Sequence, residues 1–290
     1  MDNLVKTTVS RRTMMLSLAA AAAIRSAFAK VGNVEVGVTG SDEDFSKAVE
    51  YGFDYYEPSA MVIAGLTDSA FADFRAKVMA SRMRCKCFNH LMGGADLIVV
   101  GPTVNQNAVV NYLDSTLNRC KQLGGEMVVY GSPGTRKVPE GFSKDHAWRQ
   151  LVSFLQRAGD IAQSKGLIVA IEPCNQKETN TLNTGEETLR ILHDVNHPCV
   201  KMIIDVRHMR AEKEDPSIVL KARDQLVHFH FSAPLPKGGW PKTVEEDPDY
   251  PRLFGYLKEI YFHGGISIEA QGKFETDAAP ALAFFKKVLS

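Results

Sequence analysis

The sequence lacks an excess of charge of either sign and lacks the motifs of several common function classes. Its 290 residues contain 34 Lys and Arg against 34 Asp and Glu. This balance gives no electrostatic reason to expect a nucleic-acid partner or an anionic membrane surface. Neither GxGxxG nor GxxxxGK[ST] follows the first apolar run, which disfavours a dinucleotide-binding or P-loop protein.

Cysteines are few and carry no metal-binding spacing. None of the five forms a CxxC pair, which argues against a zinc ribbon. Cys85 and Cys87 are two residues apart on a predicted strand, so we expect them to point the same way without being placed to form a disulfide. We expect the cysteines to be mainly core residues.

A long hydrophobic run is also missing, although the first 29 residues differ from the rest. The paired arginines Arg11-Arg12 precede an apolar run from Met14 to Ile24, and Ala27-Phe28-Ala29 resembles a cleavage site. The run is far shorter than the roughly 20 residues of a membrane-spanning helix. Residues 1–29 therefore predict a twin-arginine-type export signal, a periplasmic location and no stable membrane anchor after cleavage. A membrane anchor or a plain amphipathic helix is the alternative.

After this segment, short apolar runs alternate with amphipathic stretches, and no linker or repeat interrupts them. We predict one α/β domain over residues 30–290. Eight strands alternating with helices over about 250 residues are typical of a (β/α)8 TIM barrel, and a doubly wound open sheet is the alternative. The predicted strands are Val34–Val38, Phe53–Glu57, Cys85–His90, Met127–Gly131, Leu167–Glu172, Val200–Asp205, Leu226–Phe231 and Ile266–Ala270.

The last four predicted strands each end in an ionisable side chain of the same parity. Successive side chains on a strand point to opposite faces, and in a barrel the apolar set should face the helices and the polar set the lumen. This pattern brings Glu172, Asp205, His230 and Glu269 to the C-terminal mouth. Taken singly, each could be a solvated carboxylate or a hydrogen-bonded core histidine.

Taken together, these four residues favour a divalent metal site. Three converging carboxylates would repel one another and raise their pKa values unless a cation neutralised them. Three oxygen ligands and one nitrogen ligand favour Mn²⁺, Mg²⁺ or Co²⁺, and Zn²⁺ stays open. We expect one ion, with Mn²⁺ first.

The blocks "AIEPCNQKETNTLNT", "IIDVRHM", "HFHFSAP" and "GGISIEA" resemble the metal-binding blocks of the xylose-isomerase-like TIM-barrel superfamily, in its sugar isomerase and epimerase branch. The resemblance extends over the chain after Ala29. It implies that Glu172, Asp205, His230 and Glu269 are the metal ligands, and that Glu178 and His208 contact substrate.

One block departs from the family. Ketose 3-epimerases of this branch carry an arginine shortly after the metal-binding histidine, whereas this chain reads "FSAPLPKGGWPK". Lys237 is the nearest cation in that stretch, so we expect it to contact substrate.

Other residues at the expected mouth are candidates for substrate contact or for structural roles. Glu57, Asn89 and His90 end the second and third predicted strands, and Arg136 could close over the site from the fourth loop. Trp240 could stack on a sugar face or serve as a packing anchor.

These residues predict an enzyme that acts on a small carbohydrate through an enediolate. A divalent ion stabilises such an intermediate, and Glu172 and Glu269 could serve as base and acid on its two faces. Epimerisation and aldose-ketose isomerisation are the first expectation. A lyase that eliminates the aglycone of a 3-keto glycoside is the second, and a non-catalytic exported carbohydrate-binding protein is the third. A multi-metal phosphodiesterase of the same fold would need more histidines at the strand ends and a basic surface.

Overall fold

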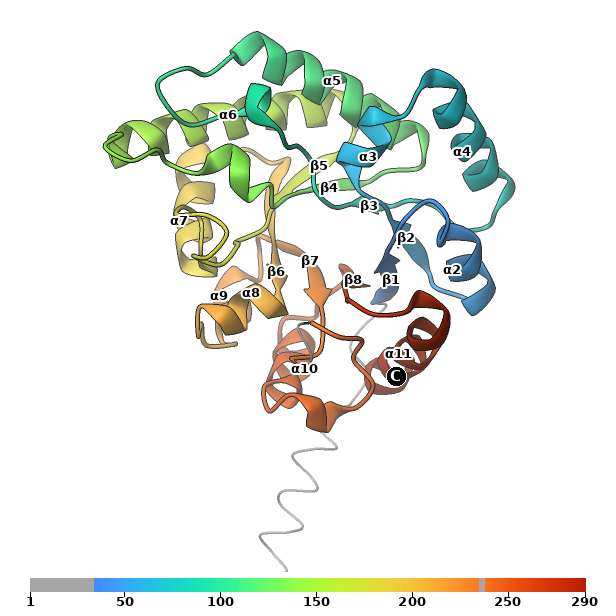
Figure 1. The fold of residues 1–290 in the computed structure, drawn as a ribbon. Coiled ribbons are helices and arrows are strands. Elements are labelled where there is room, and N and C mark those ends of the chain that lie inside the picture. Colours follow the sequence, from blue (N-terminus) through green and yellow to red (C-terminus); the bar gives the residue numbers. More distant parts are fainter. Residues whose placement is uncertain (1–33, 235–237) are drawn as a thin grey trace, which may run out of the picture.

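The structure, a computed structural model, describes residues 34–234 and 238–290. Eight parallel strands form a nearly closed barrel, and helices surround it (Figure 1). The TIM barrel expected from the sequence is therefore confirmed. The strands are β1 (Glu35–Thr39), β2 (Tyr55–Glu57), β3 (Cys87–Phe88), β4 (Met127–Tyr130), β5 (Ile168–Ile171), β6 (Val200–Asp205), β7 (Leu226–Phe231) and β8 (Gly265–Ile268).

The barrel closes between β2 and β3, where regular pairing is weakest. The ladder runs in the order β2-β1-β8-β7-β6-β5-β4-β3. Between its two ends, the backbone N–H of Tyr56 donates to the carbonyl of Arg84 at 3.0 Å, and Ser59 forms a parallel bridge with Asn89. These bonds satisfy backbone groups that an open sheet edge would leave exposed.

The third strand is shorter than the sequence predicts. The expected strand Cys85–His90 is reduced to Cys87–Phe88, and His90 adopts φ 46°. Residues in this left-handed region cannot continue a strand. Cys85 lies before the strand begins, so strand alternation does not relate it to Cys87: Cys85 packs in the core between barrel and helices, and Cys87 packs in the lumen. The expectation that the two cysteines point the same way is wrong.

Helices fill the connections and cover the outside of the barrel. In the described part of the chain they are α2 (Phe45–Tyr51), α3 (Ala60–Gly65), α4 (Asp68–Ala80), α5 (Gln106–Gln122), α6 (Lys144–Lys165), α7 (Gly185–Val195), α8 (Val206–Ala211), α9 (Ile218–Ala222), α10 (Tyr250–Glu259) and α11 (Phe274–Leu289), with the 3₁₀ turns η1 (Ala95–Leu97), η2 (Pro133–Arg136) and η3 (Val244–Glu246). None of the described helices is both long and apolar enough to cross a membrane.

The start of α7 shows how the sequence fixes one of these connections. Thr184 accepts a hydrogen bond from the backbone N–H of Glu187 at 3.1 Å, and the Glu187 carboxylate accepts one from the N–H of Asn183 at 2.9 Å. The Thr184 hydroxyl thus satisfies one donor that the first helical turn leaves unpaired, and the Glu187 carboxylate satisfies the N–H of the residue before the cap. This capping also fixes the end of the long loop that follows β5.

Two apolar cores lie on the two sides of the strands. The larger one packs strand side chains such as Val169 and Ile171 against the helices, and the smaller one in the lumen includes Ala170 and Ile203. The predicted alternation along β5 is therefore confirmed. The lumen is apolar in its lower part and polar toward the C-terminal ends of the strands, where TIM barrels place their sites.

Candidate metal and sugar site

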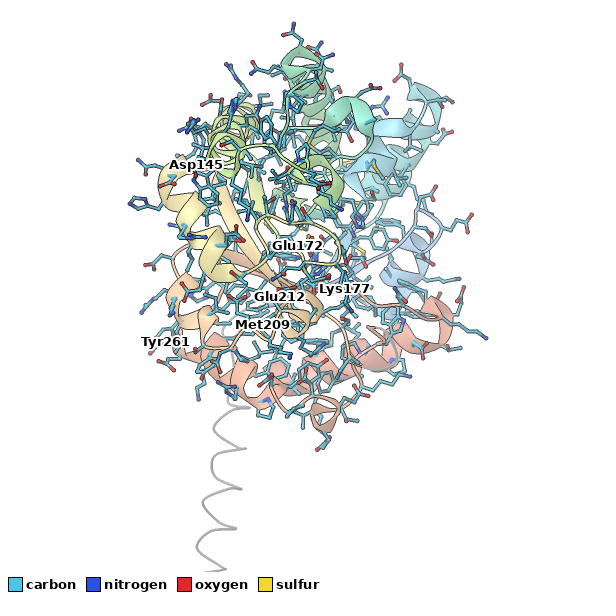
Figure 2. The ribbon with its side chains drawn as sticks, turned by 60° about the vertical axis from the view of Figure 1, so that its left-hand side comes forward. Asp145, Glu172, Lys177, Met209, Glu212 and Tyr261 are labelled. Carbon is cyan, nitrogen blue, oxygen red and sulfur yellow. The ribbon has the colours of Figure 1, made fainter. Side chains whose placement is uncertain are left out.

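Four side chains from the ends of consecutive strands meet at the mouth of the barrel. One ligand atom each from Glu172, Asp205, His230 and Glu269 lies within 4.8 Å of the others. Asp205 and His230 belong to β6 and β7, while Glu172 and Glu269 follow β5 and β8 directly. Figure 2 shows Glu172 among the side chains at the centre of the barrel. The structure brings together the four residues that the sequence singles out as a metal-binding set.

His230 is the centre of this group. Its Nδ1 lies 3.1 Å from Glu172 Oε1 and 2.8 Å from Glu269 Oε2, and its Nε2 lies 2.9 Å from Glu57 Oε1. One imidazole therefore contacts three carboxylates. Its pKa is raised well above the ordinary value because Glu57 and Glu269 together outweigh the opposing effect of burial.

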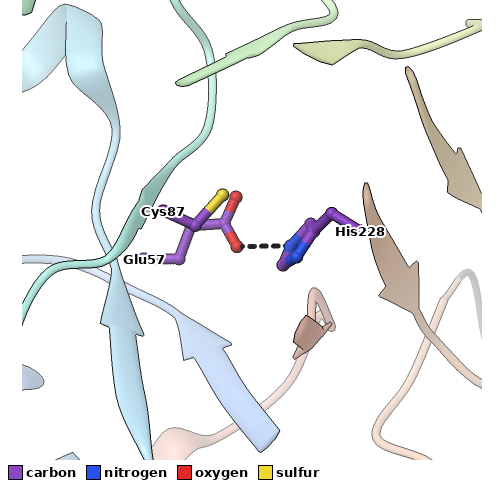
Figure 3. Close-up of side chains that lie close together, drawn as sticks. All are labelled: Glu57, Cys87 and His228. Atoms are coloured by element: carbon purple, nitrogen blue, oxygen red, sulfur yellow. Dashed lines mark hydrogen bonds and ion pairs between the residues drawn. The ribbon is translucent and has the colours of Figure 1, made fainter. Parts of the chain in front are cut away.

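A second, fully enclosed polar layer lies beneath the four residues. The Glu57 carboxylate is completely buried. Its Oε1 faces His230, and its Oε2 lies 3.0 Å from His228 Nε2 (Figure 3). Ser267 Oγ donates to that same oxygen, and Tyr55 lies 2.9 Å from Ser267 through its hydroxyl. Burial alone would raise the pKa of Glu57, but His230 and His228 hold it well below its usual range.

This lower layer orients His230 for metal binding. An ionised Glu57 carboxylate only accepts hydrogen bonds, so it holds a proton on His230 Nε2. Nδ1, which faces Glu172 and Glu269, is then the nitrogen whose proton a metal ion would displace. Metal-binding histidines in general donate their other N–H to a carboxylate or carbonyl in this way. The residues present therefore fit a divalent ion at Nδ1 together with the three upper carboxylates.

Two acids of the upper layer have opposite pKa shifts. Burial raises the pKa of Asp205 to about 6, and the charges of Glu172 and Glu269 add to the effect. Burial would also raise the pKa of Glu269, but His230 beside it lowers the value to about 2. The charge of Asp205 is thus less well compensated by the protein than that of Glu269, and a cation bound beside it would relieve this.

The loop after β5 carries a second set of polar groups beside the metal-binding set. Asn175 Nδ2 donates to Glu178 Oε1 at 3.1 Å and lies 2.7 Å from His208 Nδ1. His208 is buried at the start of α8, where its backbone N–H donates to Asp205 Oδ1 at 2.8 Å. Glu178 and His208, which the resemblance implies as substrate contacts, therefore lie together and next to a predicted metal ligand.

Arg207 lies over the same cluster from α8. Its Nη1 is 3.2 Å from Glu178 Oε1, its Nη2 is 2.9 Å from His208 Nε2, and its side chain remains 43% exposed. Burial would lower the pKa of Arg207, but the carboxylates of Asp205 and Glu178 raise it. A guanidinium thus lies at the open side of an acidic site.

Two of the expected substrate contacts lie elsewhere than the sequence suggests. Glu57 is enclosed beneath His230, so its oxygens are directed at His230 and His228 and away from the mouth. Arg136 is fully buried and donates to the backbone carbonyls of Tyr130 at 3.1 Å and Glu172 at 2.8 Å. Arg136 therefore fixes the backbone that carries Glu172 and does not close over the site as expected.

The remaining candidates divide between the mouth and the core. His90 is exposed, and its charge contributes to the lowered pKa of Glu269, so it belongs to the mouth. Asn89 is buried, with no hydrogen-bond partner for its Oδ1 in the described chain. Trp240 is buried and packs edge-on against Phe274 with ring centroids 5.6 Å apart, as a packing anchor does. Lys237 lies outside the described residues.

Four further residues belong to the site although no motif in the sequence indicates them: Arg207, Asn175, His228 and Ser267. Strand parity already places His228 and Ser267 on the lumen face with His230 and Glu269, so that signal was available. Arg207 lies on a helix and Asn175 in a loop, and no strand pattern predicts the direction of such side chains.

A comparison with protein-family models matches residues 45–288 to the family described as "Xylose isomerase-like TIM barrel". The chain belongs to this family. The match includes all four predicted metal ligands.

Relatives within and around this xylose isomerase-like family include sugar epimerases. The chain is 27% identical over 243 residues to an L-ribulose 3-epimerase from Methylomonas sp. (strain DH-1), covering 80% of this chain and 78% of the relative. It shares its fold with a 3-keto-D-glucoside 4-epimerase, YcjR, from E. coli, with a TM-score of 0.71, 18% identity and coverage of 87% and 99%. It also shares its fold with the IOLI protein "with a binding zinc atom", with a TM-score of 0.68, 20% identity and coverage of 88% and 96%.

Proposed function

We propose that this protein is a metal-dependent sugar epimerase, which inverts the configuration of a carbon next to a ketose carbonyl. The observation that carries the proposal is that Glu172 and Glu269 approach His230 Nδ1 from different strands, at 3.1 Å and 2.8 Å. Two carboxylates converging on one point can serve as base and acid in a single proton exchange.

Each carboxylate has a defined role in this proposal. A divalent ion bound by the four residues would supply Lewis-acid stabilisation of negative charge on substrate oxygen. One of Glu172 and Glu269 takes the proton from the substrate carbon, and the other returns a proton to the opposite face. Asp205 contributes charge and holds the start of α8, while Glu57 keeps His230 Nε2 protonated.

The names of the relatives favour epimerisation over the other fates of an enediolate. The Methylomonas relative is an L-ribulose 3-epimerase, and the E. coli protein of the same fold is a 3-keto-D-glucoside 4-epimerase. An epimerase inverts one stereocentre and loses no group, whereas the lyase would release an aglycone. We therefore place ketose epimerisation first, with isomerisation and the 3-keto glycoside lyase as outcomes of the same test.

The test is NMR of candidate sugars in deuterated water. The mature protein with Mn²⁺ is incubated with L-ribulose, D-psicose and a 3-keto glucoside. An epimerase gives a stereoisomer of the substrate, with no group lost and with solvent deuterium at the inverted carbon. Released aglycone with an unsaturated sugar would instead identify the lyase. Binding of sugar without deuterium entry or product, with metal bound, would contradict any proton-transfer function and leave a carbohydrate-binding protein.

We propose Mn²⁺ as the ion in use, because three carboxylates and one imidazole suit it better than a metal that prefers thiolates. Metal-free protein reloaded with Mn²⁺, Mg²⁺, Co²⁺ or Zn²⁺ provides the test. The highest turnover is expected with Mn²⁺, and activity that persists after complete metal removal would contradict metal dependence.

We also propose export to the periplasm, supported by Arg11-Arg12 and Ala27-Phe28-Ala29. These residues lie outside the described part of the chain. N-terminal sequencing of protein from the periplasmic fraction is expected to begin near Lys30. Cytoplasmic protein that retains Met1 would contradict the proposal.

A further inference from the structure

The arrangement around His208 fixes which of its nitrogens carries a proton. The backbone N–H of Asn175 donates to His208 Nδ1 at 3.1 Å. A backbone N–H is always a donor, so Nδ1 must be the acceptor. A neutral imidazole with an accepting Nδ1 carries its proton on Nε2.

The side chain of Asn175 strengthens this assignment. Its Oδ1 accepts from the backbone N–H of Lys177 at 3.1 Å, which determines which end of the amide is oxygen. Its Nδ2 therefore faces Glu178 Oε1 at 3.1 Å and His208 Nδ1 at 2.7 Å. Two donors, the backbone N–H and the Nδ2 of Asn175, therefore point at His208 Nδ1. Exchanging the amide oxygen and nitrogen of Asn175 would lose its hydrogen bonds to Lys177 and Glu178.

The consequence is a pair of donors with no acceptor between them. Arg207 Nη2 lies 2.9 Å from His208 Nε2. His208 Nε2 carries the proton of the neutral imidazole, and Arg207 Nη2 carries hydrogen because a guanidinium has no acceptor. Within the described chain, each of these two nitrogens has the other as its hydrogen-bonding neighbour. Two converging N–H groups repel each other unless an oxygen accepts from both.

We infer that Arg207 Nη2 and His208 Nε2 form a binding site for one substrate oxygen, with Arg207 supplying a guanidinium where this chain has no arginine shortly after its metal-binding histidine. The inference rests on the proposed function and deepens it. Glu178 holds the guanidinium in place through Nη1 at 3.2 Å. Asn175 is a positioning residue that sets the tautomer of His208.

The site favours an uncharged sugar oxygen over a permanent anion. Glu172, Asp205 and Glu269 already face the same mouth, and half of the Arg207 fork is paired with Glu178. A phosphate or carboxylate would add charge to an acidic site, whereas a carbonyl oxygen brings none until the proton leaves carbon. Donors aimed at an oxygen where charge develops are the arrangement that stabilises an enediolate.

A second arginine, Arg252, provides a matched control. Arg252 on α10 has the same 43% side-chain exposure and is also paired with a carboxylate, Asp215, at 2.7 Å. Arg252→Met removes an equally exposed paired guanidinium away from the site. It should leave both the kinetics and the metal content unchanged.

The first arm of the experiment measures ketose turnover by Mn²⁺-loaded wild type, Arg207→Met, Arg207→Lys and Arg252→Met. Removing one such donor costs about 100- to 1000-fold in kcat, so Arg207→Met should lose about that factor in kcat/KM while keeping its metal. Arg207→Lys retains charge without the planar fork and should recover part of the loss. Arg207→Met that matches wild type would overturn the inference. Tight binding of inorganic phosphate in competition with the ketose would contradict the preference for an uncharged sugar oxygen.

The second arm does not depend on activity. Nitrogen-15 NMR of histidine-labelled, Mg²⁺-loaded protein reports the tautomer of His208, assigned by the signal that His208→Asn removes. A proton on Nε2 is expected. A proton on Nδ1 would let Nε2 accept from Arg207, and the oxygen site would not exist. If wild type turns over no sugar, the proposed function fails, and this spectrum alone decides the inference.

Discussion

The upper and lower polar layers of the barrel lumen contain similar residues in opposite electrostatic states. In the lower layer, Glu57 is fully buried, and its two oxygens form hydrogen bonds with His228, His230 and Ser267. In the upper layer, Glu172 and Glu269 share the single Nδ1 of His230, and Asp205 has a ligand atom within 4.8 Å of theirs. The Glu269 side chain is 26% exposed. The Glu57 carboxylate of the lower layer is satisfied by the protein, whereas the carboxylates of the upper layer are, in the proposed function, completed by a cation. Carboxylates with such different surroundings should respond differently to substitution, pH and metal.

The largest effect is expected from the proposed acid and base of the upper layer. Gln at Glu172 or Glu269 keeps the shape of the side chain but cannot exchange the proton, so kcat should fall by about two to four orders of magnitude. Ketose turnover together with metal content measures the loss. Full activity in either variant would exclude that residue from proton transfer.

Asp205→Asn should separate metal binding from folding. Asn can still accept from the N–H of His208 and begin α8, but it loses the charge that attracts the ion. Isothermal titration should show metal affinity reduced by about 10- to 100-fold or more. Metal occupancy equal to wild type at limiting Mn²⁺ would contradict the ligand assignment.

The raised pKa of Asp205 also predicts how metal-free stability depends on pH. A folded pKa of about 6 against an ordinary value of 3.8 means that ionisation disfavours the folded state. The contribution of this group to stability is full below about pH 4 and is lost as pH rises through 6. Metal-free Asp205→Asn should therefore unfold with a free energy about 1–3 kcal/mol above that of metal-free wild type at pH 8, and show little difference near pH 4. Denaturant titrations at both pH values measure this, and metal should abolish the difference.

The lower layer should act on metal binding from a distance. Glu57→Gln removes the charge that holds the proton on His230 Nε2, so metal affinity should fall by about 10- to 100-fold. Cys87→Ala is the matched control, because Cys87 lies beside the same carboxylate (Figure 3). Burial raises the pKa of the Cys87 thiol, so this substitution removes a neighbour of Glu57 without removing a charge. Equal affinities of Glu57→Gln and wild type would contradict the proposed orienting role.

The smallest effect is expected at Trp240. Its ring is buried against Phe274, so Trp240→Phe should change KM for a ketose by less than about twofold. A loss of affinity greater than tenfold with unchanged stability would instead indicate sugar stacking.

The sequence predicts the barrel and the four upper residues because both depend on strand periodicity. The order and number of strands follow from the alternation of apolar runs, and parity places Glu172, Asp205, His230 and Glu269 on one face. The direction of loop and helix side chains has no such rule. Arg136 follows β4 and could have faced the mouth, yet its guanidinium is buried against backbone carbonyls.

The same limit explains why the sequence pattern does not indicate Arg207 and does not predict the depth of Glu57. Arg207 stands between Asp205 and His208 in the block "DVRH", but its position over Glu178 depends on how α8 meets the loop after β5. Glu57 ends a strand as expected, and its depth in the lumen follows from the register between β1 and β2, which pairs it with Thr39. Whether a carboxylate orients a histidine or contacts substrate thus depends on how strands and helices pack against one another, which the local sequence pattern does not show.

The most direct test of the two-layer account is anomalous diffraction from crystals of the mature protein grown with Mn²⁺. A single strong peak among Glu172, Asp205, His230 and Glu269 is expected. The lower group of Glu57, Cys87 and His228 also has ligand atoms within 4.8 Å of one another, but its acid is already satisfied by its neighbours, so no peak should appear there. A peak in the lower group, or none in the upper group at saturating Mn²⁺, would contradict the account.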